Sequence, residues 1–413
     1  MHALHDSTLS IQTAPPAPSG SDDALRRALA ALTAEEDAGT AGLAPPYDAR
    51  KVGAALAFLV ARGVDRPPLP GAAPGATLAR WRMLASVAAH DVGLVKLYEG
   101  HTDALAILAE LGAPAAPAGT RWAVWAAEPP QARLIARSAS DVQAATPTGT
   151  ADAAGAGAGA GTDDASGLAQ GERPDGTPHR LRLDGRKAWC SGAANVTHAL
   201  ITAWLDDQTS CLVQVALDQP GVRVTGEGWH ARGMAATASV DVVFENAAAT
   251  LVGAPGEYLA RPGFWHGGAG IGACWFGAAA AIGRYTAARL AGRAAGGALD
   301  DFSALYAGEL DLALAAGVTL LREAAALIDA APQENAQALA MRVRLEIEAL
   351  AEKVVRIAGR ALGAAPLCRD ARFAALMTDL PVFLRQSHAE RDLAAYGRAG
   401  IQQRTTGEQA WRL

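Results

Sequence analysis

The stretch Lys187-Ala188-Trp189-Cys190-Ser191-Gly192 carries the strongest fold signal in this chain of 413 residues. It sets an aromatic ring, a hydroxyl group and a glycine next to one another. A second motif, Gly233-Met234-Ala235-Ala236-Thr237-Ala238-Ser239, follows further along and leads into Phe244-Glu245. Alone, Trp189 is most simply a core aromatic of a β domain and Ser191 a turn hydroxyl. The spacing of the two motifs makes them far more specific together than either is alone.

The segment around these motifs has the pattern of a β domain. Short alternating or β-branched runs are separated by Asp-Gly, Asp-Asp and Gly-rich turns, as is typical of antiparallel strands. We therefore predict an antiparallel β-barrel or sandwich over residues 117–255. An Ala/Gly-rich segment near 142–178 has too little apolar surface to offset its ordering entropy, so we expect a flexible surface insertion there. It is not a phosphate loop, because no Lys-Ser/Thr follows its glycines.

Both flanks of this segment are predicted to be helical. Apolar residues such as Leu25, Leu29 and Leu32 recur at helical spacing, and Pro-rich stretches separate the helices. We predict a disordered tail at 1–21, an all-α domain at 22–116 and a helical bundle at 256–413. The fold class is thus α+β multidomain: an N-terminal helical domain, a central β domain and a C-terminal four-helix bundle. Its last helices are expected at 333–362 and 381–396.

Two details of the helical parts are open to more than one interpretation. One N-terminal helix is expected to carry Trp81 through Leu97 and the next to begin near Leu105, with His101 in a loop or cap between them or lining a pocket. The aromatic segment 258–266 either forms a wall of the substrate pocket or packs the domain junction.

Composition excludes several classes of function. The net charge is −6 and the basic residues are scattered, so nucleic acid is not an expected partner. The four cysteines stand far apart with no CxxC spacing, which argues against a zinc site or a disulfide framework and favours a reducing cytoplasm. No basic and apolar leader and no long block of large apolar residues stands out, so no membrane is expected either.

The two motifs resemble those of the acyl-CoA dehydrogenase family. In that family a Lys-x-Trp-Ile-(Thr/Ser) strand lays its ring and hydroxyl against a flavin, and a Gly-Met-Arg-x-(Ser/Thr) turn precedes a strand ending in Phe-Glu. The family's order of helices, β domain and four-helix bundle agrees with the order predicted from the residues.

The resemblance implies a seat for FAD in the β domain. Trp189 and Ser191 fall where the family places its flavin-contacting Trp and Thr, and Gly192 would allow a close backbone approach. Glu128-Pro129 is similar to the family's Thr-Glu-Pro, but Ala127 replaces the threonine. Only the backbone amide of Ala127 would then serve the flavin.

The resemblance also implies a binding site for the adenine dinucleotide part of FAD. Arg289 matches an arginine at the start of the bundle, and Arg293 could substitute for it. The segment from Arg360 to Gly363 matches a Gln-x-x-Gly-Gly turn contributed by a neighbouring subunit, with Arg in place of Gln. A guanidinium suits a pyrophosphate, although each arginine could equally lie on a solvated helix face.

The catalytic base is the point where the chain departs from the family. After Arg369-Asp370-Ala371-Arg372 the family has Glu-Gly-Thr, whereas this chain has Thr378-Asp379-Leu380-Pro381. Asp379 is the nearest carboxylate by spacing, with helix N-cap as its competing role. His388 and Glu390 are further candidates on the last helix, where His388 could instead simply pair with Asp392.

These features lead to one expected function and two alternatives. The first is FAD-dependent oxidation of an acyl-CoA or acyl-carrier-protein thioester to its α,β-enoyl form, with electrons passing to an electron-transfer flavoprotein. The second is a flavin-dependent monooxygenase of the same fold. The third is a non-catalytic binding protein. No metal is expected, and shared flavin sites imply a homodimer or homotetramer.

Overall fold

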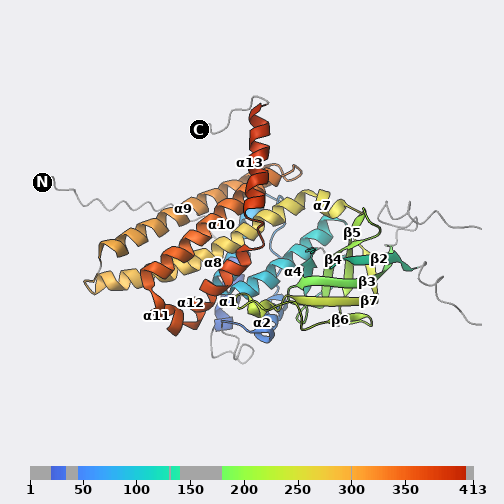
Figure 1. Ribbon diagram of the computed structural model, residues 1–413, viewed down its shortest axis with the longest axis horizontal. Coiled ribbons are helices and arrows are strands. Elements are labelled where there is room, and N and C mark those ends of the chain that lie inside the picture. Colours follow the sequence, from blue (N-terminus) through green and yellow to red (C-terminus); the bar gives the residue numbers. More distant parts are fainter. Residues whose placement is uncertain (1–19, 34–44, 130–131, 140–178, 299, 406–413) are drawn as a thin grey trace, which may run out of the picture.

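The computed structural model describes residues 20–33, 45–129, 132–139, 179–298 and 300–405 (Figure 1). The insertion expected near 142–178 lies outside the described residues. So does most of the tail expected at 1–21, except that its last two residues already begin the first helix. The β domain lies at one end of the molecule, and the long helices of the C-terminal part extend to the other (Figure 1).

The N-terminal part is helical, as predicted, but one helix boundary differs from the prediction. Asp91 is extended, with φ −160°, and its side chain accepts a 2.8 Å hydrogen bond from the Leu94 amide, so it caps a new helix. The helix expected from Trp81 through Leu97 is therefore two helices. The apolar spacing continues across the break and hides it. The helices are α1 (Gly20–Thr33), α2 (Ala49–Ala61), α3 (Ala76–His90) and α4 (Val92–Glu110).

His101 lies inside α4, so the loop or cap expected there is wrong. The ring is buried. Its Nε2 lies 3.0 Å from a carboxylate oxygen of Asp65, and its Nδ1 accepts a 3.1 Å hydrogen bond from the Trp122 amide. Both ring nitrogens thus tie α4 to neighbouring segments, which assigns His101 a structural role.

The central part is a seven-stranded sheet that closes on itself. Strand β4 pairs with β2 and β5, and the path β2-β3-β7-β5 completes the circuit. The expected all-antiparallel arrangement is only partly matched, because β1 and β2 both run parallel to β4. The strands are β1 (Trp122–Trp125), β2 (Leu134–Ser138), β3 (Arg180–Cys190), β4 (His198–Trp204), β5 (Ser210–Ala216), β6 (Val222–Val224) and β7 (Val240–Leu251).

The C-terminal part is helical, again with one corrected boundary. Helices α8 and α10 contact each other and both contact α9 and α12. The helix expected at 381–396 is wrong, because Pro381 lies inside α12 and the chain turns only after Leu384. The helices are α7 (Glu257–Ala260), α8 (Pro262–Ala295), α9 (Asp301–Ala330), α10 (Gln337–Leu362), α11 (Ala364–Arg369), α12 (Ala371–Leu384) and α13 (Glu390–Thr405).

Small residues bring α8 close to its neighbours. A Cβ on Gly277 would lie 2.3 Å from the backbone oxygen of Ala85 on α3, so only glycine fits this crossing. Helix α9 is long and apolar enough to cross a membrane, yet only 17% of its most apolar window is buried. The α9 helix thus exposes a large apolar surface.

Candidate functional site

Trp189 lies at the end of β3 on an irregular stretch of backbone. The pairing of β3 with β7 shifts register between Lys187 and Cys190, and Trp189 adopts a left-handed φ of 56°. Its side chain is 51% exposed, so the indole is not sealed in the core. Met234 and Ala238, in the turn formed by the second sequence motif, also have positive φ. Such strained residues cluster at ligand sites more often than in ordinary sheets.

A chain of hydroxyl groups links the two sequence motifs. Ser191 Oγ lies 2.8 Å from Ser239 Oγ, which lies 2.8 Å from Thr237 Oγ1. Thr237 donates to the Met234 carbonyl at 2.8 Å. Because the proton of Thr237 is committed, Ser239 must donate to Thr237 and Ser191 to Ser239. The free lone pairs of Ser191 are therefore left to accept a hydrogen bond from a ligand.

Asp379 joins α12 to this turn. Its carboxylate accepts a 2.6 Å hydrogen bond from the Met234 amide, and burial raises its pKa. A Cβ on Gly233 would lie 2.2 Å from the Thr378 carbonyl, so the turn packs directly on the helix. The expected N-cap role of Asp379 is wrong, because the residue lies well inside α12. The sequence signal for a cap, Pro381, is in this case a helix-interior proline.

An ion pair between the buried Lys187 and the partly exposed Glu128 supports the strand that carries Trp189. The Lys187 ammonium is fully buried and donates to the Thr202 carbonyl at 2.9 Å and to Glu128 at 3.3 Å. Glu128 also accepts from Trp204 Nε1 at 2.9 Å. The charges of Lys187 and Glu128 thus pair with each other. Ala127, immediately before Glu128, is exposed. The sequence motif did not indicate this supporting role of Lys187.

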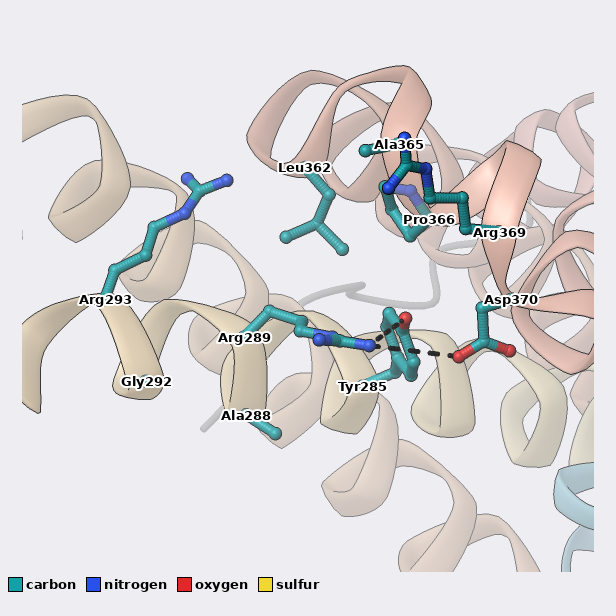
Figure 2. Close-up of a pocket in the computed structure, with 10 residues that line it drawn as sticks. All are labelled: Tyr285, Ala288, Arg289, Gly292, Arg293, Leu362, Ala365, Pro366, Arg369 and Asp370. Atoms are coloured by element: carbon teal, nitrogen blue, oxygen red, sulfur yellow. Dashed lines mark hydrogen bonds and ion pairs between the residues drawn. The ribbon is translucent and has the colours of Figure 1, made fainter. Parts of the chain in front are cut away.

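A pocket of about 630 Å³ lies between α8 and the α11–α12 segment (Figure 2). Three arginines line it: Arg289, Arg293 and Arg369. Arg289 donates to the Tyr285 hydroxyl at 2.8 Å and lies 4.0 Å from Asp370, while Arg293 donates to the Ala361 carbonyl at 3.1 Å.

The sequence predicts only part of this pocket. It indicates Arg289 as a ligand for the dinucleotide, with Arg293 as a possible substitute. Arg360 is exposed and does not line the pocket, whereas its neighbour Leu362 does, and Gly363 ends α10 with φ 66°. Arg369 was missed as a ligand candidate, although it stands in the Arg-Asp-Ala-Arg motif.

Glu390 in α13 and His388 just before this helix lie apart from Trp189. The His388 side chain is 71% exposed and lies 3.4 Å from Asp392, while Glu390 is exposed in the first turn. Helix α13 packs on α10, and no contact of α13 with the β domain is among the principal helix and strand contacts of the described chain. The pairing of His388 with Asp392, expected as the alternative, is confirmed.

A second group of charges, which the sequence did not reveal, lies between the helices. Lys96 and Glu99 of α4 form a 3.1 Å ion pair, and burial raises the pKa of Glu99. Arg80 of α3 is buried, and both Arg80 and Arg344 of α10 interact electrostatically with the Glu99 carboxylate. Burial lowers the pKa of each guanidinium group. The space between α3, α4 and α8 is therefore polar. Among the described residues, no group of His, Cys, Asp and Glu side chains is arranged to hold a metal.

Comparison with solved structures identifies the fold. KijD3 in complex with dTDP matches with TM-score 0.70 at 18% identity, covering 94% of this chain and 98% of that chain. FMN-bound TdsC from Paenibacillus sp. A11-2 matches with TM-score 0.67 at 16% identity, covering 93% and 97%. Butyryl-CoA dehydrogenase from Megasphaera elsdenii matches with TM-score 0.66 at 14% identity, covering 94% and 100%.

No protein-family model and no curated protein matches the chain. The structural matches nevertheless span almost its whole length. The chain thus has the fold of the acyl-CoA dehydrogenase-type flavoproteins, as the two sequence motifs predicted. The class of the reaction and the identity of the substrate are not fixed by the fold.

Proposed function

We propose that this protein is a flavin-dependent oxidoreductase whose flavin ring lies against Trp189. The observation that carries the proposal is the half-exposed indole on strained backbone, beside a serine whose lone pairs are free. When bound, a flavin supplies hydride or electron transfer. In this arrangement Trp189 gives the ring an apolar surface, Ser191 accepts a hydrogen bond from it, Gly192 permits close approach, and the exposed Ala127 offers its amide.

We propose that the cofactor is FAD and that its diphosphate is held in the arginine pocket of Figure 2, by a neighbouring subunit. Support comes from the three guanidinium groups of Arg289, Arg293 and Arg369, which bind phosphate oxygens well. Arg360 and Gly363 do not line this pocket, so the proposal does not rely on them. FMN, which is bound in the TdsC structure, has no adenylate for such a pocket to hold.

The subunit contact that this arrangement needs has a candidate surface on α9. Phe302, Leu305, Leu312 and Leu327 are each at least half exposed on this helix. Exposed apolar patches of this kind mark interfaces. We therefore propose a homodimer or homotetramer assembled through α9, and we attribute the membrane-like composition of α9 to that contact. The four free cysteines agree with a cytoplasmic location.

The first candidate reaction is the oxidation of an acyl-CoA or acyl-carrier-protein thioester, followed by electron transfer to an electron-transfer flavoprotein. The observation in its favour is Asp379, the predicted base that contacts the turn beside Ser239. Its pKa is raised by burial, which strengthens a carboxylate as a proton acceptor. Glu390, in the first turn of α13, and His388, just before that helix, are poorly placed for this role.

The second candidate is monooxygenation of a polar substrate. The observation in its favour is the charge buried between α3 and α4, because Lys96, Glu99 and Arg80 suit a polar substrate better than an apolar acyl chain. TdsC, described as a dibenzothiophene monooxygenase, has the same fold.

A single pair of assays separates these two reactions. Bleaching of the flavin band on anaerobic addition of acyl thioesters supports dehydrogenation, whereas oxygen uptake that depends on supplied reduced flavin supports monooxygenation. A preparation that stays colourless after incubation with FAD and FMN overturns both and leaves a binding protein.

A further inference from the structure

A second arginine-lined pocket lies between α1, α3, α8 and α12. Its volume is about 490 Å³, and it shares no lining residue with the pocket of Figure 2. Four arginines line it, one from each of these helices: Arg26, Arg82, Arg284 and Arg372.

The floor of this pocket is made of small residues and one aromatic ring. Ala85 and Ala89 of α3 face Gly277 and Ala280 of α8, and Phe276 stands half-buried beside them. Gly277 lets α8 approach α3 closely, since any larger residue there would collide with the α3 backbone. The floor of the pocket is thus formed where these two helices cross.

The charges around this pocket are poorly compensated. Within the described chain, none of the four arginines forms an ion pair with a carboxylate, and Arg372 has only a 3.3 Å hydrogen bond to the Ala89 carbonyl. Burial, together with repulsion from Arg372, lowers the pKa of Arg284. Asp22 interacts electrostatically with Arg26 and Arg82, but it is buried and burial raises its pKa.

The remaining titratable group of the lining does not supply a negative charge. The His90 Nε2 lies 2.7 Å from the Tyr47 hydroxyl, and burial lowers the pKa of this ring to about 4, so it is neutral at pH 7. Arg26, Arg284 and Arg372 are exposed and Arg82 is half-buried, so water screens part of their mutual repulsion, and a bound polyanion would offset the remainder.

We propose that this pocket binds a compound carrying a diphosphate group, at a site separate from the proposed flavin site. Arg82 and Arg284 line the pocket from α3 and α8, Arg26 and Arg372 line it from α1 and α12, and the apolar floor would accept the part of the compound next to the diphosphate. A free inorganic diphosphate and a nucleoside diphosphate share this chemistry.

Calorimetric titration of the full-length protein with inorganic pyrophosphate and with ADP tests the proposal. We expect saturable binding of both ligands and a loss of at least about tenfold in affinity in the R82A/R284A double variant, because each lost charge-assisted hydrogen bond is a large part of the binding free energy. Because the pocket of Figure 2 is itself expected to take a diphosphate, the titrations are repeated in an R293A/R369A background, where the binding that depends on Arg82 and Arg284 should persist. R356A, on the exposed face of α10, is the charge-matched control and should retain this binding. Equal affinities identify the diphosphate alone as the recognised group, and tighter ADP binding identifies a nucleotide.

Two results would overturn the proposal: no binding at millimolar pyrophosphate or ADP, or an R82A/R284A variant that binds as tightly as the wild type. Thermal unfolding shows whether that variant is folded, and R82K/R284K, which keeps both charges, should recover part of the affinity. A protein that takes up neither FAD nor FMN but still binds pyrophosphate through Arg82 and Arg284 would contradict only the proposed function.

Discussion

The carboxylate of Asp379 on α12 accepts a 2.6 Å hydrogen bond from the backbone amide of Met234, at the turn that carries the second sequence motif. This bond connects the C-terminal bundle to the strand end where Trp189 and Ser191 lie. Asp379 is therefore either the base of the reaction or the residue that holds the turn in place, and the two roles respond differently to substitution.

Replacing Asp379 separates these two roles. The amide oxygen in D379N can still accept from Met234, so a positioning role predicts near-normal stability and turnover. A role as base predicts that turnover falls by about 100-fold or more in D379N. D379A removes the acceptor in either case and should lower the free energy of unfolding by about 1–3 kcal/mol, because the Met234 amide is left unpaired. Steady-state kinetics and urea unfolding measure these effects, and a fully active, fully stable D379A contradicts both roles.

Ser191 is predicted to hydrogen-bond the flavin through its free lone pairs. S191A should therefore bind flavin about fivefold more weakly, as expected for one lost hydrogen bond of about 1 kcal/mol, and should shift the flavin absorption band. S210A, on β5, removes a hydroxyl that makes no hydrogen bond in the described chain and serves as the control. An S191A protein with wild-type affinity and spectrum would rule out the assigned contact.

The arginine pocket of Figure 2 predicts a difference between the two flavins. R369A should weaken FAD binding by about tenfold and leave FMN binding unchanged, because only FAD carries the adenylate phosphate that this pocket is proposed to hold. R356A loses the same charge on an exposed face of α10 and should change neither affinity. Equal losses for FAD and FMN would show that Arg369 acts through the fold.

Asp91 predicts a specific pH dependence of stability. Burial raises its pKa to about 6, so the folded protein binds this proton more tightly than the unfolded chain does. The stability from this group is present below about pH 4 and is lost as the pH rises through 6. D91N can still cap α4, so at pH 7 it should exceed the wild type in free energy of unfolding by up to about 3 kcal/mol, and the difference should vanish near pH 4. A constant difference at all pH values would contradict a charged, buried Asp91.

His90, next to Asp91, acts in the opposite direction. Burial lowers the pKa of its ring to about 4, so its contribution is present at neutral pH and is lost as the pH falls from about 6.5 to 4. The two groups therefore partly cancel in the wild type. D91N removes only one of them, and we expect it to lose stability on acidification more steeply than the wild type does.

The apolar face of α9 predicts subunit association. L312D places a charge on a side chain that is 73% exposed at the proposed contact, and it should convert the oligomer to monomers in light scattering. L259D, at a leucine that is 55% exposed on α7, should leave the oligomer intact. A monomeric wild-type protein would refute assembly through α9.

The sequence predicted the order of helices, β domain and bundle because hydrophobic spacing and turn residues act locally. It did not predict the break at Asp91, since the apolar period of α3 continues into α4 and a single capping side chain decides the boundary. Pro381 led to a wrong prediction of where the last helices begin and end, because a proline inside a helix is tolerated when the surrounding bundle holds it. The two motifs located Trp189 and Ser191, whose roles depend on adjacent residues.

The sequence did not predict contacts between segments that are far apart in the chain. Arg369 and Arg293 face one pocket only because α11 folds back toward α8, and the charges of Lys96 and Arg80 meet only through helix packing. Neither arrangement leaves a local pattern in the chain.

Titration of the purified protein with FAD, followed by quenching of flavin fluorescence, tests the central claim most directly when the wild type is compared with W189A. A ring stacked on this indole predicts saturable binding with strong quenching in the wild type, and both weaker binding and markedly less quenching in W189A. Equal affinity and equal quenching in the two proteins would contradict a flavin seated at Trp189.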